Sequence, residues 1–181
     1  MKKIIVILLS LILILTFASC GGSQNEEAAP EGGSDSTPAD SGDLFTFSTE
    51  TFEGEPFSSE DVKDAKLVMV NLWEPWCGPC VGEMPDLEKV YEEFKDEGFV
   101  ILGVFTDFTQ DEATADILEE AGITYPILRA TKEFEGFQTS YVPTSVFLTG
   151  EGKLVSSEPV IGSQSYDAWK STVESLLEEM K

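Results

Sequence analysis

The segment from Lys66 to Phe105 constrains the fold of this chain most, because its residue pattern is strand, helix, strand. Residues 66–73 form a continuous apolar run of strand length, as expected for a strand buried on both faces. Apolar side chains recur at three- and four-residue spacing from Met84 to Phe94, which predicts a helix ending near Gly98. Residues 99–105 are apolar again, so the segment predicts a crossover between two parallel strands.

A Cys-x-x-Cys motif stands where the first apolar run meets the helix, in the stretch Trp76-Cys77-Gly78-Pro79-Cys80. Two thiols at this spacing, the first at the start of a helix, can attack a disulfide and then close on each other. A structural disulfide is the alternative, but a bridge that closes so small a loop stabilises a fold little. The motif therefore predicts redox chemistry.

Metal binding is the next alternative for the two cysteines. Zinc would require a second pair of cysteines or histidines, and the chain has no histidine. The same absence argues against protease-like catalysis by a cysteine and a histidine. We expect neither a metal nor another cofactor.

Residues 1–19 have the pattern of an export signal. Lys2 and Lys3 precede an apolar run that ends at Leu15, shorter than the roughly 20 residues a bilayer-spanning helix needs. An uncleaved anchor helix is the alternative. The ending Phe17-Ala18-Ser19-Cys20 resembles a bacterial lipoprotein signal, in which the cysteine becomes the lipid-bearing first residue. This resemblance implies lipidation of Cys20 and a lipid-anchored location at the extracytoplasmic face of the cell membrane.

Residues 20–43 contain mainly Gly, Ser, Pro, Ala, Thr and acidic residues. Such a segment cannot bury enough apolar surface to offset the entropy lost on ordering, so we expect a disordered acidic linker. The remainder, residues 44–181, suits a single domain with one hydrophobic core, and we expect a monomer.

The chain is strongly acidic. Its net charge is −23, and removal of Lys2 and Lys3 with the signal segment would make it −25, with nine basic and 34 acidic residues remaining. We expect no nucleic-acid partner, because phosphate contacts need clustered Lys and Arg. The acidity predicts solubility and self-repulsion, with steering toward basic partners as a second interpretation.

Further elements follow from patterning along the domain. An opening hairpin is predicted from alternation in residues 44–52 and a turn at 53–56, followed by a short capped helix at 58–62. Helices are predicted at 111–121, closed by Gly122, and at 166–180. A short strand is expected at 123–125 or slightly later, and a hairpin at 145–156.

This order of motifs looks like the thioredoxin fold, and more narrowly it resembles the TlpA/ResA-like thiol:disulfide oxidoreductases, which are membrane-tethered proteins of the bacterial envelope. The narrower resemblance is carried by Asn71-Leu72-Trp73, Trp76 to Cys80, Glu83-Met84-Pro85, Val142-Pro143-Thr144 and an insertion around residues 107–130. It implies an α/β thioredoxin-like fold: a central mixed β-sheet flanked by helices, an N-terminal β-hairpin and a central αβ insertion.

The two cysteines take different roles. Cys77 is expected at the amino end of a helix, where free backbone N–H groups and the helix dipole stabilise a thiolate and make it the nucleophile. Cys80, one turn further and more buried, would resolve the mixed disulfide by attacking the Cys77 sulfur. Gly78 and Pro79 keep the turn tight and belong to the expected substrate-binding surface, together with Trp76.

The resemblance assigns further roles. Thioredoxins carry an acid where this chain has Asn71, whereas the TlpA/ResA-like group carries a glutamate three residues after the second cysteine, which Glu83 matches. Burial would raise the pKa of that carboxyl and allow it to exchange a proton with Cys80. A first-turn glutamate that merely favours the helix dipole is the alternative. Pro143 matches the cis-proline of the fold, which would present the backbone of Val142 to a substrate.

These features predict an enzyme, a protein-disulfide oxidoreductase that reduces disulfides of exported proteins through a Cys77/Cys80 cycle. The family implies a membrane electron donor of the CcdA/DsbD type, and apocytochrome c or an envelope methionine sulfoxide reductase as substrate. A disulfide-forming oxidase would use the same residues. A thiol peroxidase is another alternative, although Glu74 stands where that class needs Thr, and Arg129 is the only arginine. A non-catalytic lipoprotein is the third.

Overall fold

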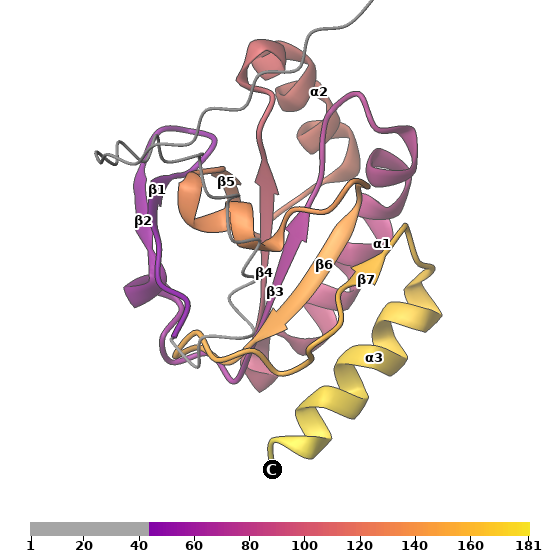
Figure 1. The fold of residues 1–181 in the computed structure, drawn as a ribbon. Coiled ribbons are helices and arrows are strands. Elements are labelled where there is room, and N and C mark those ends of the chain that lie inside the picture. Colours follow the sequence, from indigo (N-terminus) through magenta and orange to yellow (C-terminus); the bar gives the residue numbers. More distant parts are fainter. Residues whose placement is uncertain (1–43) are drawn as a thin grey trace, which may run out of the picture. The chain divides into compact units, whose positions relative to one another are not determined.

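The computed structural model describes residues 44–181 (Figure 1). The predictions of a signal segment, lipidation at Cys20 and an acidic linker concern residues 1–43 and lie outside the described part. A five-stranded sheet with the order β5-β4-β3-β6-β7 forms the centre of the domain. Its strands are β3 (Leu67–Leu72), β4 (Phe99–Phe105), β5 (Ile127–Arg129), β6 (Thr144–Leu148) and β7 (Val160–Ile161).

The sheet is mixed, as expected. Strands β3 and β4 are parallel, with Leu67 opposite Phe99 and Leu72 opposite Val104, so the crossover predicted from the apolar pattern is confirmed. β5 continues the parallel half beside β4, whereas on the other side of β3 strand β6 runs antiparallel to β3 and β7 runs antiparallel to β6. Strand β3 therefore occupies the centre of the sheet, and its carboxyl end leads directly to the cysteine motif.

Each face of the sheet has its own core. Alternate side chains of β3, such as Leu67 and Met69, pack toward helices α1 (Gly78–Phe94) and α3 (Tyr166–Glu179). Val68, Val70 and Leu72 point to the opposite face. There they meet residues from the N-terminal segment and from the 3₁₀ helix η5 (Lys132–Phe137). Figure 1 shows α1 and α3 on one side of the sheet and the N-terminal hairpin on the other.

The insertion between β4 and β5 contains η4 (Phe108–Gln110) and α2 (Asp111–Ala121). Helix α2 has the predicted bounds, and Gly122 ends it in the left-handed conformation with φ 66°. The short strand β5 begins at Ile127, which agrees with the prediction of a strand at 123–125 or slightly later. Helix α1 continues into η3 (Lys95–Glu97) and the chain turns at Gly98, as predicted.

The predicted N-terminal hairpin is confirmed, but its first strand covers only part of residues 44–52. Strand β1 (Ser48–Glu50) pairs with β2 (Pro56–Ser58), which leads into the short helix η2 (Ser59–Asp61). The earlier alternation has another cause: Phe45 and Phe47 are buried in the second core. The Phe45 amide bonds the Gly152 carbonyl instead of a strand partner.

The second strand of the hairpin predicted at 145–156 is wrong in extent. After β6 the chain makes only an isolated bridge between Leu148 and Leu154, and the strand that pairs with β6 is β7. The turn approaches the N-terminal segment so closely that a Cβ at Gly152 would lie 2.0 Å from the Phe45 carbonyl oxygen. Among residues 44–181, no helix has the length and apolar character needed to cross a membrane.

Candidate active site

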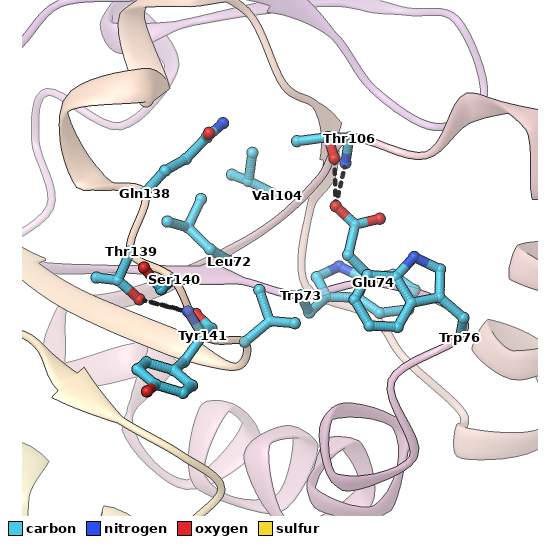
Figure 2. Close-up of a pocket in the computed structure, with 11 residues that line it drawn as sticks. Leu72, Trp73, Glu74, Trp76, Val104, Thr106, Gln138, Thr139, Ser140 and Tyr141 are labelled. Atoms are coloured by element: carbon cyan, nitrogen blue, oxygen red, sulfur yellow. Dashed lines mark hydrogen bonds between the residues drawn. The ribbon is translucent and has the colours of Figure 1, made fainter. Parts of the chain in front are cut away.

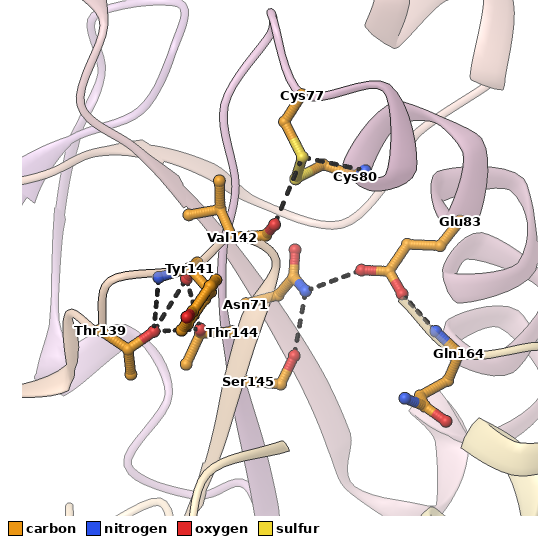
Figure 3. The surroundings of a disulfide bond; sticks show 10 residues. All are labelled: Asn71, Cys77, Cys80, Glu83, Thr139, Tyr141, Val142, Thr144, Ser145 and Gln164. Carbon is orange, nitrogen blue, oxygen red and sulfur yellow. Dashed lines mark hydrogen bonds between the residues drawn. A yellow bond between two sulfur atoms is a disulfide. The ribbon is translucent and has the colours of Figure 1, made fainter. Parts of the chain in front are cut away.

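The cysteine pair lies at the amino end of α1, directly after the central strand β3 (Figure 3). Cys77 caps the helix and Cys80 occupies its first turn; the two are joined by a disulfide with their Cα atoms 5.3 Å apart. Cys77 is 6% exposed and Cys80 is 1% exposed, so Cys77 is the less buried residue of the pair. This arrangement suits an attacking Cys77 and a resolving Cys80.

The backbone of the helix points at the Cys77 sulfur. The amide of Cys80 donates a hydrogen bond to Cys77 Sγ at 3.2 Å. An N–H group in the first turn carries the positive end of the helix dipole, and such a donor favours a thiolate over a thiol. The structure thus places a stabilising group at the atom that would carry negative charge after reduction.

The loop before β6 covers the other side of the cysteine pair. The peptide bond between Val142 and Pro143 is cis, as the resemblance implied. The carbonyl oxygen of Val142 lies 3.6 Å from Cys77 Sγ. In the disulfide this sulfur has no proton to donate, so the approach is a contact and becomes a hydrogen bond only with a thiol. Pro143 is buried, while Trp76, Gly78 and Pro79 lie exposed around the pair.

Glu83 lies one turn beyond Cys80 on the buried side of α1 and is 3% exposed. Its Oε1 accepts a hydrogen bond from Asn71 Nδ2 at 3.3 Å. Its Oε2 accepts from the Gln164 amide at 2.9 Å and from Trp169 Nε1 at 3.2 Å. All three donors are neutral groups, so no cation compensates the carboxylate at hydrogen-bond distance. Glu83 is therefore a carboxyl in the core rather than a surface residue of a first helical turn.

Burial raises the pKa of the Glu83 carboxyl above its ordinary value. The hydrogen bonds from Gln164, Trp169 and Asn71 favour the ionised form and oppose this effect without cancelling it. A carboxyl in this state can accept and return a proton closer to neutral pH than an exposed glutamate can. That is the property required of a proton acceptor for Cys80.

Asn71 links this carboxyl to the strand that follows Pro143. Its amide nitrogen donates to Glu83 and also to Ser145 Oγ at 3.0 Å. Both donor positions are thereby used, and Figure 3 shows the amide oxygen on the side of the cysteines. The asparagine that replaces the thioredoxin acid is thus a fixed, neutral part of the site.

A pocket of about 230 Å³ opens beside Trp76 (Figure 2). It lies between the carboxyl ends of β3 and β4 and the loop before β6, and its lining consists of Leu72, Trp73, Glu74, Trp76, Val104, Thr106, Gln138, Thr139, Ser140, Tyr141 and Val142. Trp76 and Tyr141 are 62% and 68% exposed. Two large aromatic side chains left in solvent beside a cysteine pair suit contact with another molecule.

Several residues of the site were not predicted. Gln164 and Trp169 belong to the last sixth of the chain, and nothing in their local sequence indicates a contact with Glu83. Tyr141 and Thr139 precede the predicted Val-Pro-Thr and could have been noted for that reason. Glu74 follows the end of a buried parallel strand, where binding residues gather, and this position in the sequence is the signal that could identify it. Among residues 44–181, no group of three or more His, Cys, Asp or Glu side chains is placed to hold a metal ion.

Comparison with known proteins identifies the family and several relatives of this chain. Residues 42–154 match the AhpC/TSA family. Thiol-disulfide oxidoreductase ResA of Bacillus thuringiensis (strain Al Hakam) is 31% identical over 115 residues, which cover 62% of this chain and 64% of the relative. The thioredoxin-like protein YneN of Bacillus subtilis (strain 168) is 35% identical over 111 residues, covering 59% and 63%. The chain thus spans slightly less than two thirds of these relatives.

A solved structure confirms the fold. The crystal structure of a thioredoxin-family thiol:disulfide interchange protein from Chlorobium tepidum TLS matches with a TM-score of 0.65 at 28% identity, covering 74% of this chain and 94% of that one. The expected thioredoxin-like fold and the expected resemblance to ResA proteins are therefore confirmed.

Proposed function

This chain belongs to the AhpC/TSA family, and we propose that it is an enzyme of thiol–disulfide exchange that acts on proteins through Cys77 and Cys80. The single observation that carries the proposal is the cysteine disulfide at the start of α1, with the backbone N–H of Cys80 directed at the Cys77 sulfur. The similarity to thiol-disulfide oxidoreductase ResA supports the same chemistry.

In the reducing direction, the cycle starts from the dithiol. The Cys77 thiolate attacks one sulfur of a substrate disulfide; the substrate S–S bond breaks, and the departing sulfur leaves as a thiolate that takes a proton from solvent. Cys80 then gives its proton to the Glu83 carboxylate and attacks Cys77 Sγ. The second substrate sulfur leaves as a thiolate, takes up a proton, and two electrons have passed from the protein to the substrate.

We place this activity at the extracytoplasmic face of the cell membrane. The export-type segment at residues 1–19, the lipoprotein-type ending at Cys20 and the acidic linker support this location. The substrates proposed are disulfides of exported proteins, with apocytochrome c and an envelope methionine sulfoxide reductase as candidates. Electrons would come from a membrane thiol carrier of the CcdA/DsbD type. The protein would act as a monomer.

The alternative of a thiol peroxidase has less support from the site. Glu74, at the position where a peroxidatic site needs Thr, is buried and bonded to the β4–η4 loop. Arg129 pairs with Asp111 and lies over the rings of Phe52, Phe105 and Phe108. Its guanidinium therefore already has a carboxylate partner.

Trapping tests the proposal. The Cys80→Ser variant is expected to accumulate disulfide-linked substrate proteins through Cys77, because the resolving thiol is missing. Cys77→Ser is the matched control and should trap none. Failure of the Cys80→Ser variant to form any mixed disulfide, together with no reduction of a disulfide substrate by the intact protein, would refute the proposal. Rapid turnover of hydroperoxide would favour the peroxidase.

The reduction potential of the Cys77/Cys80 pair decides the direction of electron flow. A value near that of thioredoxin, about −270 mV, supports a reductase, whereas one near −120 mV supports a disulfide-forming oxidase.

A further inference from the structure

The pocket beside Trp76 contains a charge that the exchange chemistry does not use. Of the residues lining it, Glu74 is the only one with a charged side chain. The remaining lining is aromatic, aliphatic or neutral polar, and the exposed rings of Trp76 and Tyr141 belong to it. Figure 2 shows Glu74 extending toward Thr106, with the indole of Trp76 beside it. The lining is thus uncharged apart from one carboxylate.

The Glu74 carboxylate is held in place entirely by neutral donors. It is 6% exposed, and its Oε1 accepts from the backbone amide of Thr106 at 3.0 Å and from the Thr106 hydroxyl. Its Oε2 accepts one hydrogen bond, from the Asp107 amide at 3.0 Å. Within residues 44–181, no lysine or arginine forms a salt bridge with Glu74. A carboxylate oxygen can accept two hydrogen bonds, so Oε2 retains acceptor capacity.

The pocket lies next to the cysteine pair. Val142 lines the pocket, and its carbonyl oxygen lies 3.6 Å from Cys77 Sγ. Trp76, another lining residue, directly precedes Cys77 in the chain. A side chain in the pocket would therefore belong to a substrate residue close to the cysteine under attack.

We propose that this pocket binds a lysine or arginine side chain next to the target cysteine of the substrate, and that Glu74 makes the enzyme prefer such substrates. This inference rests on the proposed function and deepens it. A cation in the pocket would meet a carboxylate that is buried and has no cationic partner among the described residues, so the attraction would exceed that of a pair in bulk water. The faces of Trp76 and Tyr141 add cation–π contacts. An acidic side chain would be repelled from the same place, so the charge acts mainly on specificity.

The test uses the full chain, reduced, and short synthetic peptides joined as disulfide dimers. Each peptide has one central cysteine flanked on both sides by lysine, glutamine or glutamate. Stopped-flow tryptophan fluorescence gives the second-order rate constant of reduction for each peptide. Measurements at roughly 0.5 M salt reduce the Debye length to about 4 Å, which screens general attraction to an acidic protein. The preference is the ratio of the lysine rate to the glutamine rate.

The wild-type ratio is expected to be about tenfold at high salt, and Glu74→Gln should reduce it to about twofold or less. The residual preference allows for the effect of lysine on the leaving thiol, which does not involve Glu74. Glu112→Gln removes one exposed charge from α2 and is the matched control; it should keep the wild-type ratio.

Three results would overturn the inference. One is a wild-type protein without preference for the lysine peptide, a result that needs no variant to fold. Another is a Glu74→Gln variant that slows lysine and glutamine peptides equally, as expected if Glu74 only fastens the β4–η4 loop. The third is failure of the reduced protein to react with any peptide, which would refute the proposed function as well; normal turnover without selectivity refutes the inference alone.

Discussion

Replacing Trp169 by phenylalanine should weaken Glu83 as an acid. The indole Nε1 donates a hydrogen bond to Glu83 Oε2 at 3.2 Å in the core, and phenylalanine keeps an aromatic ring but has no donor. A hydrogen bond to a charged group contributes about 1.5–3 kcal/mol. Because this bond favours the ionised carboxylate, its loss should lower the acid dissociation constant of Glu83 by about tenfold or more, since 1.4 kcal/mol corresponds to a factor of ten.

The direction of the stability change follows from proton binding. Burial already raises the pKa of Glu83, so the folded protein holds this proton more tightly than the unfolded chain does. The free energy of unfolding therefore decreases as pH rises from the ordinary carboxyl pKa through the raised value. Trp169→Phe raises the folded-state pKa further, so the decrease should be larger and continue to higher pH.

Trp73→Phe is the matched control for the loss of ring volume. Trp73 is buried to the same degree as Trp169, but its Nε1 has no hydrogen-bond partner within the described residues. Urea denaturation across pH gives the free energy of unfolding of both variants. Carbon-13 labelling of the glutamate carboxyl groups, with Glu83→Gln to assign the signal, follows the titration of Glu83 directly.

The reasoning is refuted if Trp169→Phe leaves the titration of Glu83 unchanged or moves it to lower pH. It is also refuted if the two tryptophan variants lose equal stability at every pH, because the hydrogen bond to the carboxylate would then contribute nothing beyond ring packing.

Three further predictions concern the same core and one turn. Glu83→Gln should slow release of the substrate from the mixed disulfide roughly 100-fold at neutral pH, because the proposed proton acceptor of Cys80 is removed. Single-turnover kinetics measure this rate, and an unchanged rate would mean that solvent accepts the proton. Asn71→Asp places a second carboxyl within hydrogen-bond distance of Glu83, so the two carboxyls together should bind a proton more tightly. The free energy of unfolding should then fall more steeply with rising pH than in the wild type. A free energy of unfolding that does not change with pH would contradict this. Gly152→Ala should lower the free energy of unfolding by at least about 2 kcal/mol, since φ is 88° and the new Cβ would clash with the Phe45 carbonyl. Gly122→Ala is the control: φ is 66° but no atom lies near the new Cβ, so the loss should be about 1 kcal/mol. Equal losses of the two variants in urea denaturation would refute the close approach at Gly152.

Much of the architecture could be predicted because it depends on patterns local to the chain. The apolar run at 66–73 and the helical spacing after Met84 are short-range features, and both elements formed where expected. The same holds for α2 and its closing glycine, since a helix end depends on the residues within one turn of it. The cysteine motif lies in this predictable segment, and the hypothesis of exchange chemistry followed from it.

The late hairpin shows where such reasoning ends. Alternation after residue 145 predicted two paired strands, but Gly150 and Gly152 pack against carbonyl groups of the N-terminal half, and only one bridge of the second strand forms. Strand pairing depends on which distant segment competes for the same backbone groups, and the alternation of side chains does not contain that information.

Glu83 and the pocket show the same division between what the sequence and the tertiary structure determine. That a carboxyl follows Cys80 by three residues can be read from the chain, but its burial and its bonds to Gln164 and Trp169 required the last helix to dock on α1. Glu74 likewise is the only charged residue of the pocket because the end of β4 and the loop before β6, which are distant in the sequence, contribute the rest of the lining. Local sequence specifies chemistry and secondary structure because neighbours interact at short range. Burial, charge compensation and pocket shape arise from contacts between segments many residues apart, so they are properties of the folded chain.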